Sequence, residues 1–173
     1  RSLRPLFDER IRNDVQVIVT PLSVDGENDA AITAFIAASC AITISSVPWD
    51  GPIAAARIGR INGEWVLNAT MKQIDEESDL DLVVSGTRQG IIMVEAGMKQ
   101  VAEEDVLAAF EFAMPHLQTL IDLQETLRKK AGIPKKEWDL VPFPEAVFAK
   151  MRTGYEKKLR DVFFTSGKKA RNS

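Results

Sequence analysis

Carboxylates gather in one short stretch of the chain, next to a run of apolar residues. The acidic residues of this stretch are Asp75, Glu76, Glu77, Asp79 and Asp81. Carboxylate oxygens are the ligands that Mg²⁺ prefers, so one interpretation is a magnesium site. Asp79 and Asp81 would share a face if both lie in a strand, because strand side chains alternate with a period of two. The spacing alone favours the plainer interpretation, a solvated acidic face.

The other side chains that carry chemistry are scarce. The chain has one histidine, His116, and one cysteine, Cys40. These numbers exclude an internal disulfide framework, a Cys-rich zinc site and a histidine metal cage, and they disfavour a Ser-His-Asp triad. The sequence has no glycine-rich phosphate loop, paired-cysteine motif or nucleophile elbow. By residue type alone, it predicts no complete catalytic site.

Charge and composition narrow the class of protein. Of 173 residues, 45% are hydrophobic and 27% are charged, which favours a globular core over disorder. The net charge is −3, but residues 1–150 carry −8 and residues 151–173 carry +5. A basic end can attract phosphates, but the favoured interpretation is a solvated helix with a frayed tail. No apolar run reaches the roughly 18 residues of a membrane helix, so we expect no membrane partner and a reduced, cytoplasmic setting.

Apolar periodicity predicts the elements of the first half. Val15, Val17 and Val19 alternate within residues 12–22, which predicts a strand, and Ile18 between them suggests burial on both faces. Asn28 or Asp29 then caps a helix. The apolar positions of that helix recur at helical spacing: Ile32, Phe35, Ile36 and Cys40.

Two hairpins and two helices follow. Asn62-Gly63 is a two-residue hairpin turn between strands at 53–61 and 64–67. Residues 80–85 and 91–95 form a second hairpin. A long helix starts at Glu103 and is stopped by Gly132, and a separate helix covers 145–164. The order predicts an α+β layer followed by an α-helical segment.

At these residues the chain resembles the phosphorolytic exoribonucleases, and most closely the bacterial polynucleotide phosphorylases. The motifs that carry the resemblance are RSLRPLF at 1–7, RNDVQV at 12–17, PWDGPIAAARIG at 48–59, LDLVVSGT at 80–87 and MVEA at 93–96. The resemblance is dense up to about Pro134 and thins beyond it. Because several long motifs occur in the family's order, it is specific.

The resemblance implies a fold and a domain layout. The fold is ribonuclease PH-like (ribosomal protein S5 domain 2-like), with a mixed sheet and packed helices. Residues 1–131 would be the later part of the first of two core domains, 132–144 a connector, and 145–173 the beginning of an all-helical linker domain. The chain is therefore expected to be a piece of a larger enzyme. As an isolated piece we expect it to self-associate through exposed apolar surface.

The family's reaction is phosphate-dependent 3′→5′ degradation of single-stranded RNA to nucleoside diphosphates. Family members work as rings of three chains, and Mg²⁺ offsets charge on the transferring group. In active copies a Ser- or Thr-bearing turn holds phosphate, but the matching positions here are Asp29, Ala30 and Ala31. Active copies also place two aspartates six apart. Asp79 matches the second, but Gln73 stands at the first.

These departures imply a non-catalytic copy, with no catalytic residue and no Mg²⁺ ligand expected in this chain. Its expected role is to scaffold the ring and line the RNA channel, where arginines contact phosphates without reading sequence. Arg1 and Arg4 are the RNA-binding candidates, with an ion pair at a helix end as the alternative. The second functional hypothesis is a stand-alone, catalytically inactive RNA-binding or regulatory module. A self-sufficient phosphorylase is the least favoured.

Overall fold

The computed structural model describes residues 1–171 and divides the chain into two compact units. The first unit, Arg1–Asp139, holds the sheet and its covering helices, and the second begins at Leu140. The division falls inside the predicted connector at 132–144. Backbone hydrogen bonds from Ile133 to Ile44 (3.0 Å) and from Lys136 to Ser46 (2.8 Å) attach the front of that connector to the first unit.

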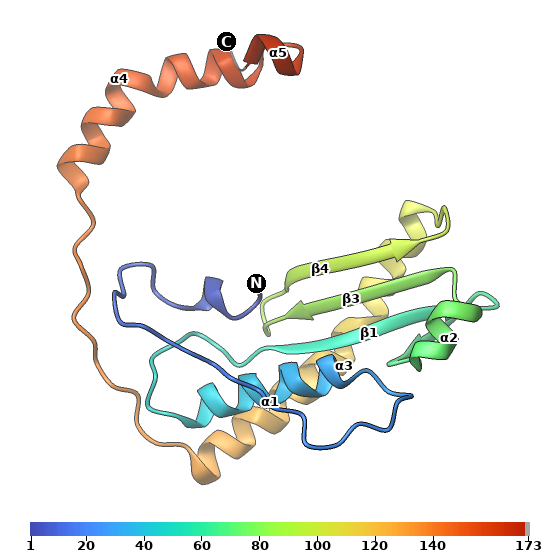
Figure 1. Ribbon diagram of the computed structural model, residues 1–173. Coiled ribbons are helices and arrows are strands. Elements are labelled where there is room, and N and C mark those ends of the chain that lie inside the picture. Colours follow the sequence, from blue (N-terminus) through green and yellow to red (C-terminus); the bar gives the residue numbers. More distant parts are fainter. Residues whose placement is uncertain (172–173) are drawn as a thin grey trace. The chain divides into compact units, whose positions relative to one another are not determined.

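One four-stranded sheet forms the centre of the first unit (Figure 1). Its strands are β1 (Ala54–Ile61), β2 (Glu64–Leu67), β3 (Leu80–Gly86) and β4 (Ile91–Met98), in the order β2-β1-β3-β4. In the central register, Ile58 lies opposite Leu67 on one side and Leu82 on the other. The α+β class is confirmed. All pairs in the described sheet are antiparallel, whereas a mixed sheet was expected.

The first hairpin forms where the sequence predicts it. Asn62 has φ 51° and Gly63 has φ 84°, so both central residues of the turn are left-handed. Two consecutive positive φ values define the turn type whose twist suits a two-residue hairpin, and Asn-Gly tolerates them best. The second hairpin joins β3 to β4, with a register shift at Ser85/Gly86.

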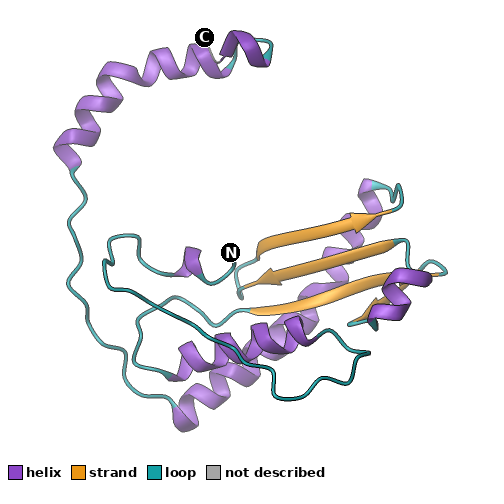
Figure 2. Cartoon of the chain, viewed as in Figure 1, coloured by secondary structure: helices purple, strands orange, loops and turns teal. Residues whose placement is uncertain are grey.

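Helices α1 (Ala30–Ile44) and α3 (Glu103–Ala131) cover the first unit, and the short α2 (Met71–Glu76) precedes β3 (Figure 2). α3 begins with three acidic residues and ends with three basic ones, which favours the helix dipole. The main core lies between α3 and one face of the sheet. Its buried residues are Ala54, Ala56, Ile58, Leu80, Leu82, Val84, Ala109, Ala113, Leu117 and Ile121.

The strand predicted for residues 12–22 is not present. This segment is an irregular loop, which Figure 2 draws in teal. Val15, Val17 and Val19 are each 39% exposed and Ile18 is 74% exposed, so burial on both faces was wrong. Strand propensity needs a neighbouring strand to satisfy the backbone, and no strand of the described chain pairs with this segment. The β-branched side chains of this segment are therefore exposed to solvent.

The second unit contains α4 (Glu145–Phe163) and α5 (Lys168–Arg171). α4 matches the predicted helix to within a residue. None of its residues is buried, and its apolar side chains, Val147, Phe148, Met151, Tyr155, Leu159, Val162 and Phe163, are all exposed. None of the helices within residues 1–171 combines the length and the apolar character needed to span a bilayer.

Candidate functional site

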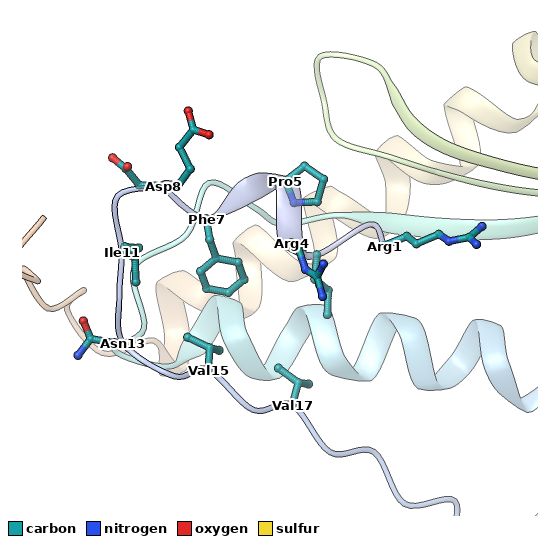
Figure 3. A pocket seen from close by; sticks show the side chains of 11 residues that line it. Arg1, Arg4, Pro5, Phe7, Asp8, Ile11, Asn13, Val15 and Val17 are labelled. Carbon is teal, nitrogen blue, oxygen red and sulfur yellow. The ribbon is translucent and has the colours of Figure 1, made fainter. Parts of the chain in front are cut away.

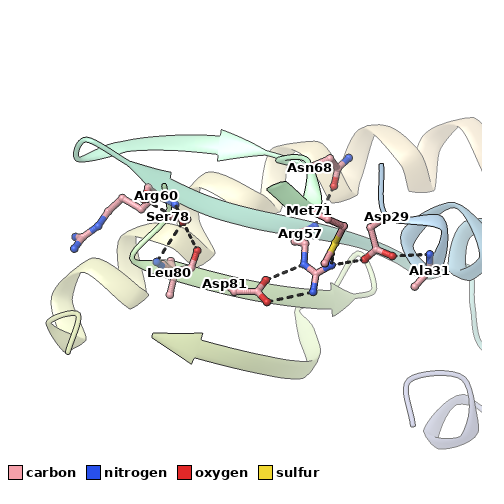
Figure 4. Close-up of polar contacts among 9 residues, drawn as sticks. All are labelled: Asp29, Ala31, Arg57, Arg60, Asn68, Met71, Ser78, Leu80 and Asp81. Carbon is pink, nitrogen blue, oxygen red and sulfur yellow. Dashed lines mark hydrogen bonds and ion pairs between the residues drawn. The ribbon is translucent and has the colours of Figure 1, made fainter. Parts of the chain in front are cut away.

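Asp29 occupies the N-terminus of α1, at the position that would have to hold a phosphate. Its Oδ1 accepts a hydrogen bond from the Ala31 backbone N–H at 2.8 Å. Its Oδ2 accepts one from Arg57 Nη1 at 2.7 Å (Figure 4). The carboxylate therefore already uses both the helix-end donor and a guanidinium. A neighbouring anion would meet a negative charge rather than free donors.

Arg57, on β1, joins Asp29 to the acidic stretch. Its Nε and Nη2 donate to the two oxygens of Asp81 on β3, at 2.8 and 3.2 Å. The Arg57 side chain is 15% exposed, so these pairs lie partly out of water. The two-pronged contact is the geometry in which arginine binds carboxylate best. Arg57 on β1 thus neutralises the charge of Asp81.

Asp79 is bound by a different arginine. Arg60 Nε and Nη2 donate to its two carboxylate oxygens at 2.8 and 2.6 Å. Arg60 also pairs with Asp105 at the start of α3, and its guanidinium lies 5.7 Å from the Trp65 ring centre. The hydrogen bond from Arg60 lowers the pKa of Asp79, against the opposing effect of burial. Asp79 serves an ion-pair network that ties β1 to α3.

The structure does not support the magnesium interpretation of the acidic stretch. Asp79 precedes β3 and contacts Arg60, whereas Asp81 lies within β3 and contacts Arg57. No three His, Cys, Asp or Glu side chains in the described chain are placed to hold a metal ion. A carboxylate that is already hydrogen-bonded to a guanidinium is a poor ligand for a hard cation.

Gln73, at the family's first aspartate position, caps α2. Its Oε1 accepts the Thr70 backbone N–H at 3.0 Å, and its own backbone N–H donates to Thr70 Oγ1 at 3.3 Å. This reciprocal capping box satisfies two donors at the helix end. The amide of Gln73 thus has a structural partner. The sequence signal was present, since Thr70 stands three residues before Gln73.

The first seven residues are fixed to the domain at three points. Ser2 is buried, and its hydroxyl lies 2.8 Å from that of Ser85 on β3. The Asp50 N–H donates to the Leu6 carbonyl at 2.9 Å. The Phe7 ring lies 5.9 Å from that of Trp49. The short 3₁₀ helix Arg4–Leu6 is therefore held in place; Arg4 is its first residue, and Arg1 lies on the segment that leads into it.

Arg1 and Arg4 are exposed and line a groove of about 1030 Å³ (Figure 3). Within the part of the chain that the structure describes, neither side chain has a hydrogen bond or an ion pair. The alternative role, an ion pair at a helix end, is therefore not seen. In contrast, Arg10, Arg57, Arg60 and Arg88 all pair with carboxylates. Two unneutralised positive charges on a fixed segment are suited to binding an anion.

The pairing roles of Arg57 and Arg60 were not predicted from the sequence. The signal that could have found them is the register of the antiparallel sheet, which sets Gly59 opposite Asp81. Residues near Gly59 on β1 then lie within reach of the acidic stretch. The register itself becomes known only once β1 and β3 are paired.

Residues 51–115 match the model of the 3′ exoribonuclease family, domain 2. Over 99% of its length the chain is 41% identical to the polyribonucleotide nucleotidyltransferase of Gemmatimonas aurantiaca and 43% identical to that of Thermus thermophilus. Over 86% of its length it is 46% identical to the enzyme of Acholeplasma laidlawii. These findings confirm the resemblance found in the sequence.

The chain spans 23%, 24% and 21% of the lengths of these three relatives. Among solved structures, rice (Oryza sativa) Rrp46 matches with a TM-score of 0.54 over 61% of this chain and 51% of that one. At 17% identity, this likeness supports the fold alone.

Proposed function

The chain carries a domain of the 3′ exoribonuclease family at residues 51–115, and from this premise we propose its function. It is a scaffold and RNA-channel portion of a phosphate-dependent 3′→5′ exoribonuclease. The whole enzyme degrades single-stranded RNA to nucleoside diphosphates in mRNA turnover. Three copies form its ring, in the cytoplasm. The portion described by residues 1–171 does not itself catalyse the reaction.

The observation that carries the RNA role is the pair of unneutralised arginines on a fixed segment. Arg1 and Arg4 flank Ser2, whose hydrogen bond to Ser85 holds the backbone between them. Guanidinium groups bind phosphate oxygens through several N–H donors at once. Because phosphates carry no base identity, such contacts bind single-stranded RNA without sequence preference.

The absence of catalysis from this portion rests on three side chains that are already engaged. Asp29 pairs with Arg57, Asp79 pairs with Arg60, and Gln73 caps α2. The whole enzyme needs inorganic phosphate and Mg²⁺, but these residues do not fit a magnesium ion. The ion's ligands and the reacting phosphate therefore belong to another part of the enzyme.

The first experiment measures the affinity of the chain for fluorescein-labelled oligo(A) by anisotropy at several salt concentrations. Replacing both Arg1 and Arg4 by alanine removes two phosphate contacts. Each contact on a single strand contributes about 0.7 to the slope of log K against log salt, so the slope falls by about 1.4. Arg88→Ala is the matched control, because Arg88 is already paired with Asp122 and Glu125 and none of these three residues lines the groove. An unchanged slope in the double variant refutes the assignment.

The second experiment tests catalysis directly. The purified chain is incubated with oligo(A), Mg²⁺ and inorganic phosphate, and release of ADP is followed, with phosphate omitted as the control. We expect no phosphate-dependent release from a sample whose folding is verified by circular dichroism. Release of ADP would show that Asp79 and other residues form a working site.

The stand-alone regulatory module remains the second candidate, because the engaged Asp29 and the neutral Gln73 suit a protein that has lost catalysis. Sequencing the natural gene separates the two candidates. A reading frame that continues into a second, aspartate-bearing core domain supports the scaffold proposal. A frame that encodes little beyond these residues supports the module.

A further inference from the structure

The C-terminal end of α1 is capped only in part by its own sequence. Its last turn contains no basic residue, and Ser45, which follows it, has an extended backbone rather than the left-handed conformation of a glycine cap. The Ser45 N–H donates to the Ala41 and Ile42 carbonyls, and its hydroxyl donates to the Ile42 carbonyl at 2.8 Å. The carbonyls that come after these must find donors elsewhere in the chain.

Two backbone N–H groups of the connector are such donors (Figure 1). The Ile133 N–H donates to the Ile44 carbonyl at 3.0 Å, and the Lys136 N–H donates to the Ser46 carbonyl at 2.8 Å. Pro134 lies between the two donors, and a residue that precedes proline favours an extended backbone. The segment is thus suited to lie alongside the residues that follow α1.

Lys135 adds a positive charge to the same contact. Its Nζ donates to the Ile42 carbonyl at 2.7 Å and to the Ser45 carbonyl at 2.8 Å. Burial, and then the nearby charge of Arg128, lowers the pKa of Lys135, so the two carbonyls partly replace water around the ammonium group. A cation at the C-terminal end of a helix is favourable. Lys135 therefore supplies, from 90 residues away, the charge that the last turn of α1 lacks.

We propose that Ile133–Lys136 form a clip that opens and closes as a unit while the rest of the first unit stays folded. Ile133 is already 57% exposed and Lys136 is exposed, so opening breaks these hydrogen bonds but uncovers little apolar surface. The closed clip leaves residues 137–144 to lead to α4, and the open clip leaves residues 132–144. It thereby sets the length of chain that links the first unit to α4.

The test is amide hydrogen exchange, measured residue by residue by NMR on the 173-residue chain. The amides of Ile133 and Lys136 report the clip, because both donate to the end of α1. The amide of Leu82, which is buried at the centre of the sheet, reports unfolding of the whole first unit. We expect matched protection factors at the two clip amides, about 10-fold or more below that of Leu82.

The variant Lys135→Met keeps the aliphatic part of the side chain but removes the ammonium group. Two hydrogen bonds from a charged donor are lost, so the protection of both clip amides falls by about 10-fold or more while that of Leu82 is unchanged. Lys136→Met is the matched control, because the exposed Lys136 side chain makes no hydrogen bond or ion pair within residues 1–171. Lys135→Arg retains the charge and the donors, so it keeps most of the protection.

A second variant, Ile133→Pro, loosens the clip from its other end by removing the N–H that binds Ile44. Gly132 already has φ −73° and ψ 145°, the extended conformation that a residue before proline needs. The protection of the Lys136 amide therefore falls while that of Leu82 is unchanged. This variant gives the readout if Lys135→Met disturbs folding.

Four outcomes overturn the proposal. Clip amides that exchange only as fast as Leu82 show that the segment opens only when the whole unit unfolds. A lack of protection at both amides in the unchanged chain shows that the clip is not closed. Protection that neither Lys135→Met nor Ile133→Pro alters shows that these contacts do not hold the segment. A fall in Lys135→Met that is confined to one of the two amides shows that the segment does not open as a unit.

Discussion

Gln124 is a buried, hydrogen-bonded side chain whose replacement by an apolar residue of similar shape should lower the stability of the first unit. It lies on α3 and is 2% exposed. Its Nε2 donates to the Ile53 carbonyl at 2.9 Å, and its Oε1 accepts from the Ser39 hydroxyl at 2.6 Å. Ser39 Oγ in turn accepts the Ile53 N–H at 3.1 Å. One amide thus connects α3 to α1 and to the residue that precedes β1.

The perturbation is Gln124→Leu, which keeps the side-chain volume but removes both polar atoms. The Ile53 carbonyl then lies buried without the Gln124 donor, and the Ser39 hydroxyl loses its acceptor while it keeps the hydrogen bond from the Ile53 N–H. An unsatisfied buried group costs about 1–3 kcal/mol, and the added apolar burial offsets part of the sum. We expect a loss of about 2–4 kcal/mol, which is a large part of the roughly 5–15 kcal/mol that stabilises a domain.

The assay is equilibrium unfolding in urea, followed by tryptophan fluorescence. With a urea dependence of about 2 kcal/mol per molar, the midpoint falls by about 1–2 M. Gln118→Leu is the matched control on the same helix. Its amide makes only long contacts, 3.4 Å to the Thr87 carbonyl and 3.5 Å to Arg88. Its effect should stay within about 0.5 kcal/mol.

A Gln124→Leu variant whose urea midpoint lies within about 0.2 M of that of the unchanged chain, roughly the size of the control effect, would refute the reasoning. Two explanations would then remain. Either water or a shifted backbone satisfies the Ile53 carbonyl, or the packing of the leucine side chain compensates for the lost hydrogen bonds.

Three further predictions concern other parts of the first unit. Gly51→Ala forces the Trp49 ring aside and destabilises the fold by about 1–3 kcal/mol, measured by thermal unfolding; an unchanged melting temperature would contradict the close approach. The hydrogen bond from Arg60 holds the pKa of Asp79 below its usual value, so this stability is present above about pH 4 and is lost as pH falls through the folded-state pKa. Asp79→Asn therefore flattens the pH dependence of unfolding below about pH 4, and an identical acid profile would show that the pair contributes nothing. The exposed extended segment promotes self-association of the isolated chain, so Ile18→Lys lowers the apparent mass measured by light scattering at high concentration. A concentration-independent monomer of the unchanged chain would contradict this prediction.

Local sequence determined the elements whose turn or cap residues interact only with neighbours a few residues away. Asn62-Gly63 supplies its own left-handed turn, Asp29 its own helix cap, and Gly132 follows the end of α3 at Ala131. Each of these depends on backbone geometry and on hydrogen bonds between near neighbours. The fold class followed from their order, and the long motifs pointed to the family.

Tertiary structure alone decided what the candidate side chains touch. The sequence offered Asp79 and Asp81 as a pair, but the antiparallel register gave each its own arginine from β1. Residues 12–22 have strand propensity, yet form no strand because that requires a neighbour. Within residues 1–171 neither Arg1 nor Arg4 has a side-chain partner, and the segment that carries them is held by Ser85 and Trp49, far along the chain. Such contacts join residues distant in sequence, so only the packed chain brings their charges and hydrogen-bonding groups together.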